Sequence, residues 1–317
     1  MSSLSTKPAA FTFAIDRDIL AELLADKRSV NTRLAYAKDL KDFFQAATGR
    51  EPDSTLVAQF LQLDRFNAIA LVLKYKAGLI EQGLKEATIN RRLAAIKSLV
   101  NFARKVGKCE WSLEDVKGEK IQAYQDTTGI DADAFKRILA IPDRSTLKGK
   151  RDYAILRLLW ECCLRRAEVS QCDIKDFDVE SKRLWILGKG KGSQKTAISL
   201  SPKTVLALQD WLLERKDLKI NQPLFISLDR ASYGHRLSCT SIYKVVNAAA
   251  ISAGITKKLS PHRIRHSGIT AALDATGGDV RRVQKLSRHA KLDTLMIYDD
   301  NRTNHQGDLT ELLSSMV

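Results

Sequence analysis

Residues 260–266 read SPHRIRH, and residues 287–298 read SRHAKLDTLMIY. Ser260 followed by Pro261 predicts the start of a helix, because serine caps helix N-termini and proline suits the first helical position. Both stretches place histidine and arginine beside apolar residues, where a simple hydrophobic core does not require them. Polar groups in such positions indicate a site that carries out chemistry, and they direct attention to the sequence upstream.

Two further clusters of the same kind precede these stretches. Residues 163–169 (CLRRAEV) contain Arg165 and Glu168, and residues 186–192 (ILGKGKG) contain Lys189 in a glycine-rich turn. Each residue alone has an ordinary structural interpretation, such as an ion pair for Arg165 and a solvated turn for Lys189. Taken together, the clusters form an ordered series along the chain: an arginine, a hairpin lysine, a His-x-x-Arg motif, a later histidine and a tyrosine. Separate structural interpretations do not explain this series.

This order and spacing resemble the signature of the tyrosine recombinase, or phage integrase, family. The family's Leu-Arg-x-Ser-Glu is similar to residues 164–168 (LRRAE), and its Pro-His-x-Leu-Arg-His is similar to residues 261–266 (PHRIRH). Its final histidine and tyrosine stand nine residues apart, as His289 and Tyr298 do. Upstream, NTRLAYAKDLKDF and TINRRLAAIKSL look like the family's core-binding domain, so the resemblance covers nearly the whole chain.

Three departures from the family pattern are visible. Arg288 occupies the position where the family usually has glycine, Ala167 replaces a small hydroxyl residue, and the hairpin GKGKGSQK is longer than the common form. None of them removes a catalytic group. The longer hairpin leaves Lys189 and Lys191 as alternatives for one role, with Lys189 preferred.

The resemblance implies a site-specific DNA recombinase that cleaves and rejoins DNA through a covalent 3′-phosphotyrosine intermediate. Such chemistry needs a nucleophile, positive charge around the phosphate and a proton for the leaving oxygen. The implied catalytic residues are Arg165, Lys189, His262, Arg265, His289 and Tyr298. Because arginines supply permanent positive charge, neither a metal ion nor a cofactor is expected. A type IB topoisomerase-like activity and an inactive DNA-binding architectural protein are the alternatives.

The residue types suit the first part of this reaction. Arg165 and Arg265 can hold phosphate oxygens bidentately through their planar guanidiniums. The phenol of Tyr298 has an ordinary pKa of about 10, and two neighbouring guanidiniums with a histidine would favour the phenolate. By resemblance, His262 assists the removal of the phenol proton.

The other residues complete the reaction or support it. The resemblance implies that Lys189 protonates the leaving 5′ oxygen and that His289 hydrogen-bonds the phosphate. Glu168 follows the first arginine by three residues, within reach on a helix, and we expect it to orient local side chains. His266 is either a buried structural histidine or a catalytic one.

The chain is predicted to be mainly α-helical, with a small antiparallel β-sheet in the catalytic domain. Amphipathic patterns predict the helices, and β-like runs at 173–178, 183–188 and 195–200 predict the sheet. The predicted organisation is a flexible segment at 1–15, a helical SAM-like core-binding domain at 16–116, a linker at 117–129, a catalytic domain at 130–300 and a tail helix at 301–317.

Capping residues mark several helix ends. Asn31 is placed to cap a helix at 31–48, and Gly107 suits the end of the helix that carries TINRRLAAIKSL. In the second domain, Asp131, Ser201 and Asp279 can each cap a further helix, besides the serine of SPHRIRH.

The formal charge of +15 and a pI near 9.6 favour a polyanionic partner, and DNA is the leading one. Arg91 and Arg92 lie opposite the apolar stripe of their helix, as either a solvated face or a DNA-contacting face would require. With the resemblance they become candidate DNA contacts, and the two domains would clamp the duplex.

There is no long apolar run, no signal sequence and no zinc-like cysteine spacing, so we expect a nucleoid-associated cytoplasmic protein without a membrane partner.

Recombination joins two duplexes, so we expect a homotetramer on paired double-stranded DNA sites and a monomer or weak dimer off DNA. At the end of the chain, Leu309, Leu312, Leu313 and Met316 form one apolar stripe on a short helix that Asp308 would cap. The stripe needs a surface that covers it, because so short a helix is marginal in water. The resemblance favours docking on a neighbouring protomer, and packing on its own domain is the alternative.

Overall fold

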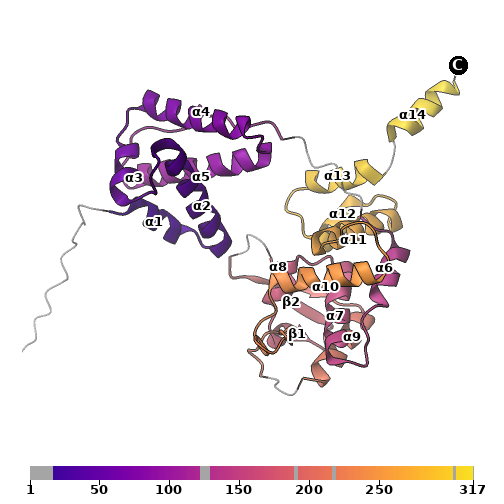
Figure 1. Cartoon of the computed structure of the whole chain (residues 1–317). Coiled ribbons are helices and arrows are strands. Elements are labelled where there is room, and N and C mark those ends of the chain that lie inside the picture. Colours follow the sequence, from indigo (N-terminus) through magenta and orange to yellow (C-terminus); the bar gives the residue numbers. More distant parts are fainter. Residues whose placement is uncertain (1–16, 122–128, 189–191, 216–218, 303–304, 317) are drawn as a thin grey trace, which may run out of the picture. The chain divides into compact units, whose positions relative to one another are not determined.

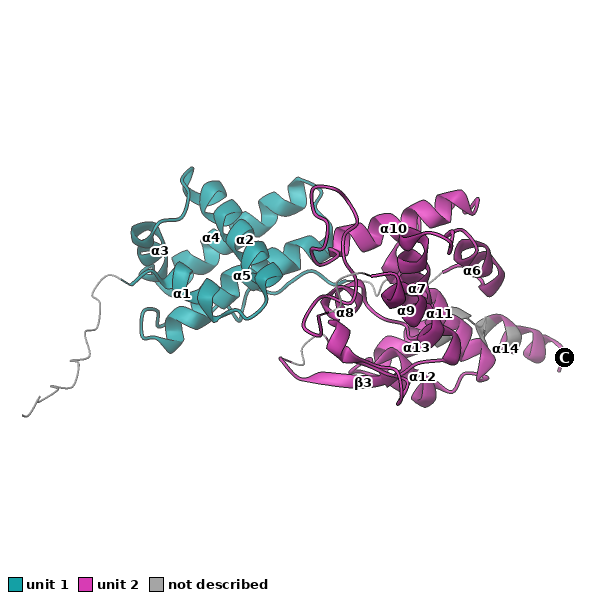
Figure 2. Cartoon of the chain, turned by 90° about the horizontal axis from the view of Figure 1, so that it is seen from below, with its two compact units in different colours: residues 1–123 teal, residues 124–317 magenta. Residues whose placement is uncertain are grey.

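The computed structural model describes residues 17–121, 129–188, 192–215, 219–302 and 305–316. The chain divides into two compact units, residues 1–123 and residues 124–317, shown in teal and magenta in Figure 2. The segment at 1–15 and most of the linker predicted at 117–129 lie outside the described residues.

Unit 1 is helical (Figure 1). Its helices are α1 (Ile19–Asp26), α2 (Val30–Thr48), α3 (Ser54–Leu61), α4 (Arg65–Glu81) and α5 (Glu86–Lys105). Asp18, Asp53 and Asp64 cap three of them by accepting backbone N–H groups. The prediction that Asn31 caps α2 is wrong. The helix begins at Val30, because Ser29 accepts the N–H of Thr32 and leaves Asn31 inside the first turn.

The core of unit 1 is built around α5, which packs against α1, α2 and α4. The predicted apolar stripe of α5 is confirmed, since Ile89, Leu93, Ile96, Val100 and Ala103 are all buried. Aromatic rings in edge-to-face contact fill much of the remaining core: Phe43, Phe44, Phe60, Tyr75 and Trp111. The core fixes which face of α5 is turned outward.

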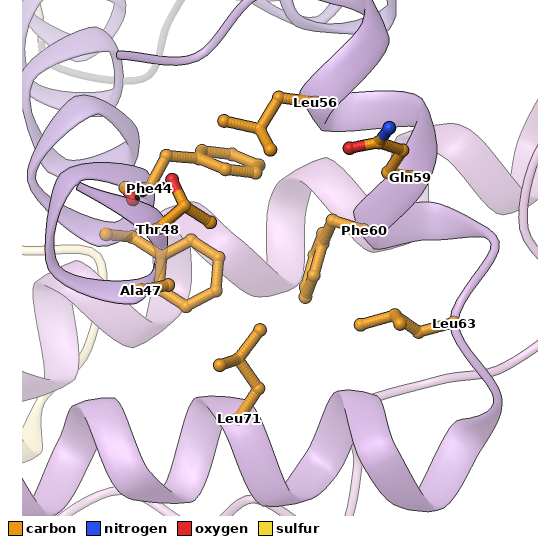
Figure 3. A pocket seen from close by; sticks show the side chains of 9 residues that line it. Phe44, Ala47, Thr48, Leu56, Gln59, Phe60, Leu63 and Leu71 are labelled. Carbon is orange, nitrogen blue, oxygen red and sulfur yellow. Dashed lines mark hydrogen bonds between the residues drawn. The ribbon is translucent and has the colours of Figure 1, made fainter. Parts of the chain in front are cut away.

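A small apolar pocket opens beside this aromatic cluster. Figure 3 shows its labelled side chains converging from α2, α3, α4 and the turn between α3 and α4, with Leu71 of α4 facing the others. Thr48 and Gln59 are the polar residues of the lining, and the hydroxyl of Thr48 donates to the carbonyl of Phe44 at 2.8 Å. The lining has no ionisable side chain. The pocket is therefore an opening in the packing of the core, without groups for chemistry.

Unit 2 is also mainly helical and contains the sheet (Figure 1). Its helices are α6 (Ala132–Leu139), α7 (Leu147–Glu161), α8 (Arg166–Gln171), α9 (Pro202–Leu213), α10 (Cys239–Ser252), α11 (Pro261–Ala275), α12 (Val280–Ser287), α13 (Asp293–Arg302) and α14 (His305–Ser314). A short 3₁₀ helix at Ile174–Asp176 leads into β1 (Phe177–Asp178), and β2 (Arg183–Leu187) and β3 (Lys195–Ser199) complete an antiparallel sheet of order β1-β2-β3. The predicted fold class is confirmed.

Capping in unit 2 follows the sequence. Asp131, Ser201, Ser260 and Asp279 each accept the backbone N–H of the residue three positions later, as predicted. Helix α7 runs through the main core and packs against α9 and α11. Helices α11, α12 and α13 pack on one another and enclose a second, smaller core. The turns at the ends of these helices carry the candidate site.

The tail helix differs from its prediction at one point. Helix α14 begins at His305, so Asp308 lies within the helix and does not cap it. The four residues of its apolar stripe are 51–67% exposed: Leu309, Leu312, Leu313 and Met316.

Within the described ranges, no single helix is long and apolar enough to cross a membrane. Helices α3 and α4 pass that test only as a pair, and they are bent by 115° relative to each other.

Candidate active site

The turn between α7 and α8 holds the first arginine of the site. Arg165 stands at the N-cap of α8, directly after the buried Leu164. The Oε2 atom of Glu168 accepts the backbone N–H of Arg165 at 2.8 Å, and its Oε1 atom accepts Nη1 at 2.9 Å. Glu168 is 2% exposed, whereas the side chain of Arg165 is 29% exposed. The buried carboxylate thus orients the arginine and leaves part of its guanidinium accessible.

Helix α11 carries the second arginine and two histidines. His262, Arg265 and His266 lie on neighbouring positions of one helix face, because they are three and four residues apart. Arg265 is 1% exposed, and its guanidinium donates to the backbone carbonyls of Cys163 and Ser287. These two carbonyls belong to the turns after α7 and at the end of α12. Arg265 therefore connects both turns to α11.

The turn after α12 holds the third histidine. Arg288 ends α12 in the left-handed conformation, with φ 58° and ψ 36°, and His289 follows it. The Nε2 atom of His289 lies 3.3 Å from Nη2 of Arg265, and its backbone carbonyl accepts Nε2 of Gln284 at 3.1 Å. This turn brings His289 beside the guanidinium of α11.

Tyr298 lies on α13 and is 4% exposed. It packs in the smaller core of unit 2 with apolar side chains of α11, α12 and α13. Burial raises the pKa of Tyr298 to about 12, although Arg265 and Arg165 act to lower it. The residue types predict that the guanidiniums favour the phenolate. The net effect here is the reverse, because burial outweighs them.

A chain of contacts joins the tyrosine to the two histidines of α11. Nε2 of His266 lies 3.4 Å from the hydroxyl of Tyr298 and 2.7 Å from Nε2 of His262. The rings of His266 and Tyr298 stack with centroids 4.8 Å apart. In the described structure, the Tyr298 hydroxyl therefore contacts His266, and His266 in turn contacts His262.

Positive charge dominates this cluster. Three guanidiniums, those of Arg165, Arg265 and Arg288, surround the carboxylate of Glu168, the one acidic group of this cluster among the described side chains. Burial, reinforced by Arg165 and Arg288, lowers the pKa of Arg265 to about 10, so it still carries its charge near pH 7. The charge that Glu168 does not neutralise suits an anion such as a phosphodiester.

The histidines carry no charge near neutral pH in this field. Burial lowers the pKa of His289 to about 4, with a further contribution from Arg265. Burial and then His262 lower the pKa of His266 to about 4. The pKa of His262 is lowered by burial and by Arg265 as well. Neutral imidazoles can accept a proton, which is what deprotonation of a phenol requires.

The predicted general acid, Lys189, and its alternative, Lys191, lie outside the described residues. The strands that flank their hairpin are paired from Arg183 with Ser199 to Leu187 with Lys195. Lys195 is held by the carboxylate of Asp176.

Comparison with known families agrees with this geometry. A profile described as "Phage integrase family" matches residues 129–305, and one described as "Phage integrase, N-terminal SAM-like domain" matches residues 20–107. The first match covers more than half of the chain.

The chain belongs to the phage integrase family of tyrosine recombinases.

Relatives of this recombinase match over nearly its full length. A tyrosine recombinase of Synechocystis sp. is 55% identical over 303 residues, which cover 96% of each chain. One of Synechococcus elongatus is 54% identical over 302 residues, covering 95% of this chain and 94% of the relative. The tyrosine recombinase XerC of Shewanella amazonensis is 32% identical and covers 78% of this chain and 81% of its own. The protein is therefore a site-specific recombinase, an enzyme that cleaves and rejoins DNA.

Solved structures share its fold. A XerH site-specific recombinase bound to its palindromic difH substrate matches with a TM-score of 0.66 at 21% identity, covering 93% of this chain and 84% of that one. A lambda integrase dimer bound to a COC′ core site matches with a TM-score of 0.62 at 14% identity, covering 90% and 77%. Both are complexes with DNA sites.

The arginines of α5 that the sequence suggests for DNA contacts have carboxylate partners within unit 1 of the recombinase. Arg91 pairs with Asp39, which is fully buried, while 44% of the Arg91 side chain stays exposed. Arg92 pairs with Asp42 at 3.2 Å and donates to the hydroxyl of Tyr75 at 3.1 Å. Their role in binding DNA stays a prediction.

Two residues near the site have contacts that the sequence does not reveal in full. The sequence leaves two interpretations open for His266, although its spacing of four residues from His262 places both on one helix face. For Arg288 the sequence shows only a departure from glycine. Its place beside Glu168 depends on a contact between residues 120 positions apart, which no local pattern reveals.

Proposed function

We propose that Tyr298 attacks the scissile phosphate while Arg165, Arg265 and His289 hold its non-bridging oxygens. The bond between the tyrosyl oxygen and phosphorus forms, and the bond to the 5′ oxygen breaks, which leaves a 3′-phosphotyrosine. The observation that carries this proposal is the convergence of three separate turns and helices. Nη2 of Arg265 is 3.3 Å from His289, and the rings of His289 and Tyr298 have centroids 6.0 Å apart.

Two proton transfers accompany the attack. The phenol proton passes to the histidines of α11, with His266 nearest to the hydroxyl and His262 in contact with His266. Lys189 donates the proton that the leaving 5′ oxygen needs. The arginines supply fixed positive charge, so the reaction uses neither a metal ion nor ATP.

The structure corresponds to a resting state in this proposal. Tyr298 is buried and its pKa is about 12, so the hydroxyl has to move toward the phosphate before it reacts. A bound phosphodiester would offset the excess positive charge and raise the pKa of the neighbouring histidines, which makes them better proton acceptors. DNA binding would thus prepare the site for the attack.

Strand exchange follows from the covalent intermediate. The tyrosyl ester keeps the energy of the phosphodiester, so a partner strand can be joined without another energy source. We infer that four protomers act on two paired DNA sites in the cytoplasm, that both units of each protomer clamp the duplex, and that the exposed stripe of α14 docks on a neighbouring protomer.

Replacing Tyr298 with phenylalanine tests the chemistry. A nicked duplex that traps cleavage should give a covalent adduct with the wild type and none with Tyr298→Phe, because one oxygen atom is lost. Gel shifts should show that binding to the site persists, since the basic surface is unchanged. A covalent adduct in the variant would show that another residue is the nucleophile.

Deletion of residues 307–317 tests the role of the tail. We expect binding to one half-site to stay within about threefold of wild type, because the deleted residues add no arginine or lysine. Cooperative filling of two half-sites and recombination should fall. Unchanged cooperativity and an unchanged recombination rate would show that α14 is not an intersubunit element.

A further inference from the structure

Arg288 makes an unusual set of contacts for a residue that ends a helix. Its Nη1 atom donates to the carbonyls of Leu286 at 2.6 Å and Cys162 at 3.1 Å. Its Nη2 atom donates to the carbonyl of Cys163 at 3.1 Å and to Oε2 of Glu168 at 3.2 Å. The side chain is 18% exposed. A surface arginine that only caps its own helix would not reach another helix in this way.

The left-handed backbone conformation of Arg288 is a second indication that its contacts hold this residue in place. Its φ of 58° lies in the left-handed region, where a side chain is strained and glycine is preferred. Such strain persists only where the surroundings hold the residue in place, as the four hydrogen bonds of the guanidinium do here.

Arg288 connects the three segments that carry the proposed catalytic groups. It directly precedes His289 in sequence, it shares the carbonyl of Cys163 with Arg265, and it shares the carboxylate of Glu168 with Arg165. The guanidinium of Arg288 therefore joins the α7–α8 turn to the α12–α13 turn, and it is linked to α11 through the Cys163 carbonyl that it shares with Arg265.

We propose that Arg288 is a positioning residue of this recombinase that keeps Arg165 available to the phosphate by sharing the Glu168 carboxylate. This inference rests on the proposed phosphate-binding role of Arg165.

The electrostatic reason is a division of charge. With Arg165 as its only ionic partner, the buried carboxylate of Glu168 would neutralise that arginine and hold it away from an anion. With a second guanidinium on Oε2, the same negative charge is shared, and net positive charge remains at Arg165. Arg288 thereby compensates for the carboxylate that orients Arg165.

Two substitutions test the proposal on the full chain. Arg288→Gly removes the guanidinium and restores the residue that suits the backbone, whereas Arg288→Lys keeps the charge without the planar fork. At saturating protein, we expect cleavage of a nicked trapping duplex to slow by about 10- to 100-fold in Arg288→Gly. This is the range of activity loss when a residue that orients a functional side chain is substituted. Arg288→Lys should lie between this variant and wild type.

Three controls separate positioning from a loss of folding. Arg151→Lys alters another buried arginine that holds a carboxylate and a carbonyl, those of Asp152 and Ile226, and it should cleave at the wild-type rate. The midpoint of thermal unfolding should fall by only a few degrees in Arg288→Gly, because relief of backbone strain offsets part of the lost hydrogen bonds, and cleavage is compared well below that midpoint. DNA binding should also change little, so the effect falls on the cleavage step.

A double-mutant cycle with Glu168→Gln gives the decisive readout. If Arg288 acts by sharing the carboxylate, Arg288→Gly should have a several-fold smaller effect on cleavage once that charge is gone. An equal loss in both backgrounds, or a wild-type rate for Arg288→Gly, would overturn the inference. Failure of wild type itself to form an adduct at Tyr298 would instead refute the proposed function.

Discussion

Each unit of this recombinase contains a pair of arginines that its sequence suggests for contact with DNA, and the two pairs differ in their surroundings. In unit 1, Arg91 and Arg92 each face a carboxylate, so two positive charges meet two negative ones. In unit 2, Arg165 and Arg265 share their surroundings with a third arginine and, among the described side chains, with the carboxylate of Glu168 alone. The backbone carbonyls of two turns hold Arg265 in place of acidic side chains.

The difference shows that charge balance, more than the presence of arginine, distinguishes a structural pair from a site for an anion. A guanidinium bound by carbonyls keeps its full charge, because carbonyls are neutral acceptors. A guanidinium bound by a carboxylate has little net field left for a distant phosphate. In unit 2, burial lowers the pKa values of His262, His266 and His289, and neighbouring positive groups lower them further.

The largest effect should come from altering the carbonyl-bound arginine. Arg265→Lys retains the charge but loses the planar fork that reaches the carbonyls of Cys163 and Ser287 and that, in the proposed function, also holds a phosphate. We expect cleavage of the trapping duplex to fall by about 10²- to 10³-fold, as for the loss of a donor that stabilises a transition state. Arg157→Lys, another buried arginine, should keep its activity and serves as the control. Equal losses in both variants would mean that Arg265 acts only through folding.

A medium effect should be a loss of stability in unit 1, and it should be larger when Arg91 is substituted than when its partner Asp39 is. Arg91→Ala leaves the buried carboxylate of Asp39 without its cation, and we expect unit 1 to lose about 2 kcal/mol, below the range for fully buried pairs because Arg91 is 44% exposed. Asp39→Asn should cost less, since the freed guanidinium can turn to water. Chemical denaturation followed through Trp111 would measure both. A larger loss for Asp39→Asn would reverse this interpretation of the pair.

A difference in pH response should also separate the two units. His266 and His289 have a pKa of about 4 in the fold and about 6.5 when unfolded. Between these values the unfolded chain binds more protons, so unit 2 should lose stability as pH falls from 6.5 toward 4. Residues 1–123 contain no histidine, and unit 1 should change little over that range.

Hydrogen exchange of the full chain at pH 7 and pH 5, corrected for intrinsic rates, would measure this difference. Protection of α11 and α12 should fall relative to α2 and α5, and His289→Gln should remove part of the change. Parallel losses in the two units would show that the histidines of the site do not control it.

Local features of the fold could be predicted from the sequence because they depend on neighbouring residues. Ser201-Pro202 starts a helix by a contact that spans three residues, and the stripe of α5 is buried as its spacing predicts. The two caps that were wrongly predicted have a local cause as well, and of the β-like run predicted at 173–178 only Phe177–Asp178 forms a strand, because Ile174–Asp176 forms a 3₁₀ helix. A better-placed serine precedes Asn31, and α14 begins three residues before Asp308.

The sequence by itself therefore determined the family, the helical pattern and the order of the candidate catalytic residues, since these depend on residue type and spacing. Only the tertiary structure decided the charge that each group experiences. Asp39 meets Arg91 across 52 positions, and Glu168 meets Arg288 across 120. Burial of Tyr298 reversed the expected direction of its pKa. Electrostatic energy depends on distance and desolvation in three dimensions, and a linear sequence specifies neither until the chain has folded.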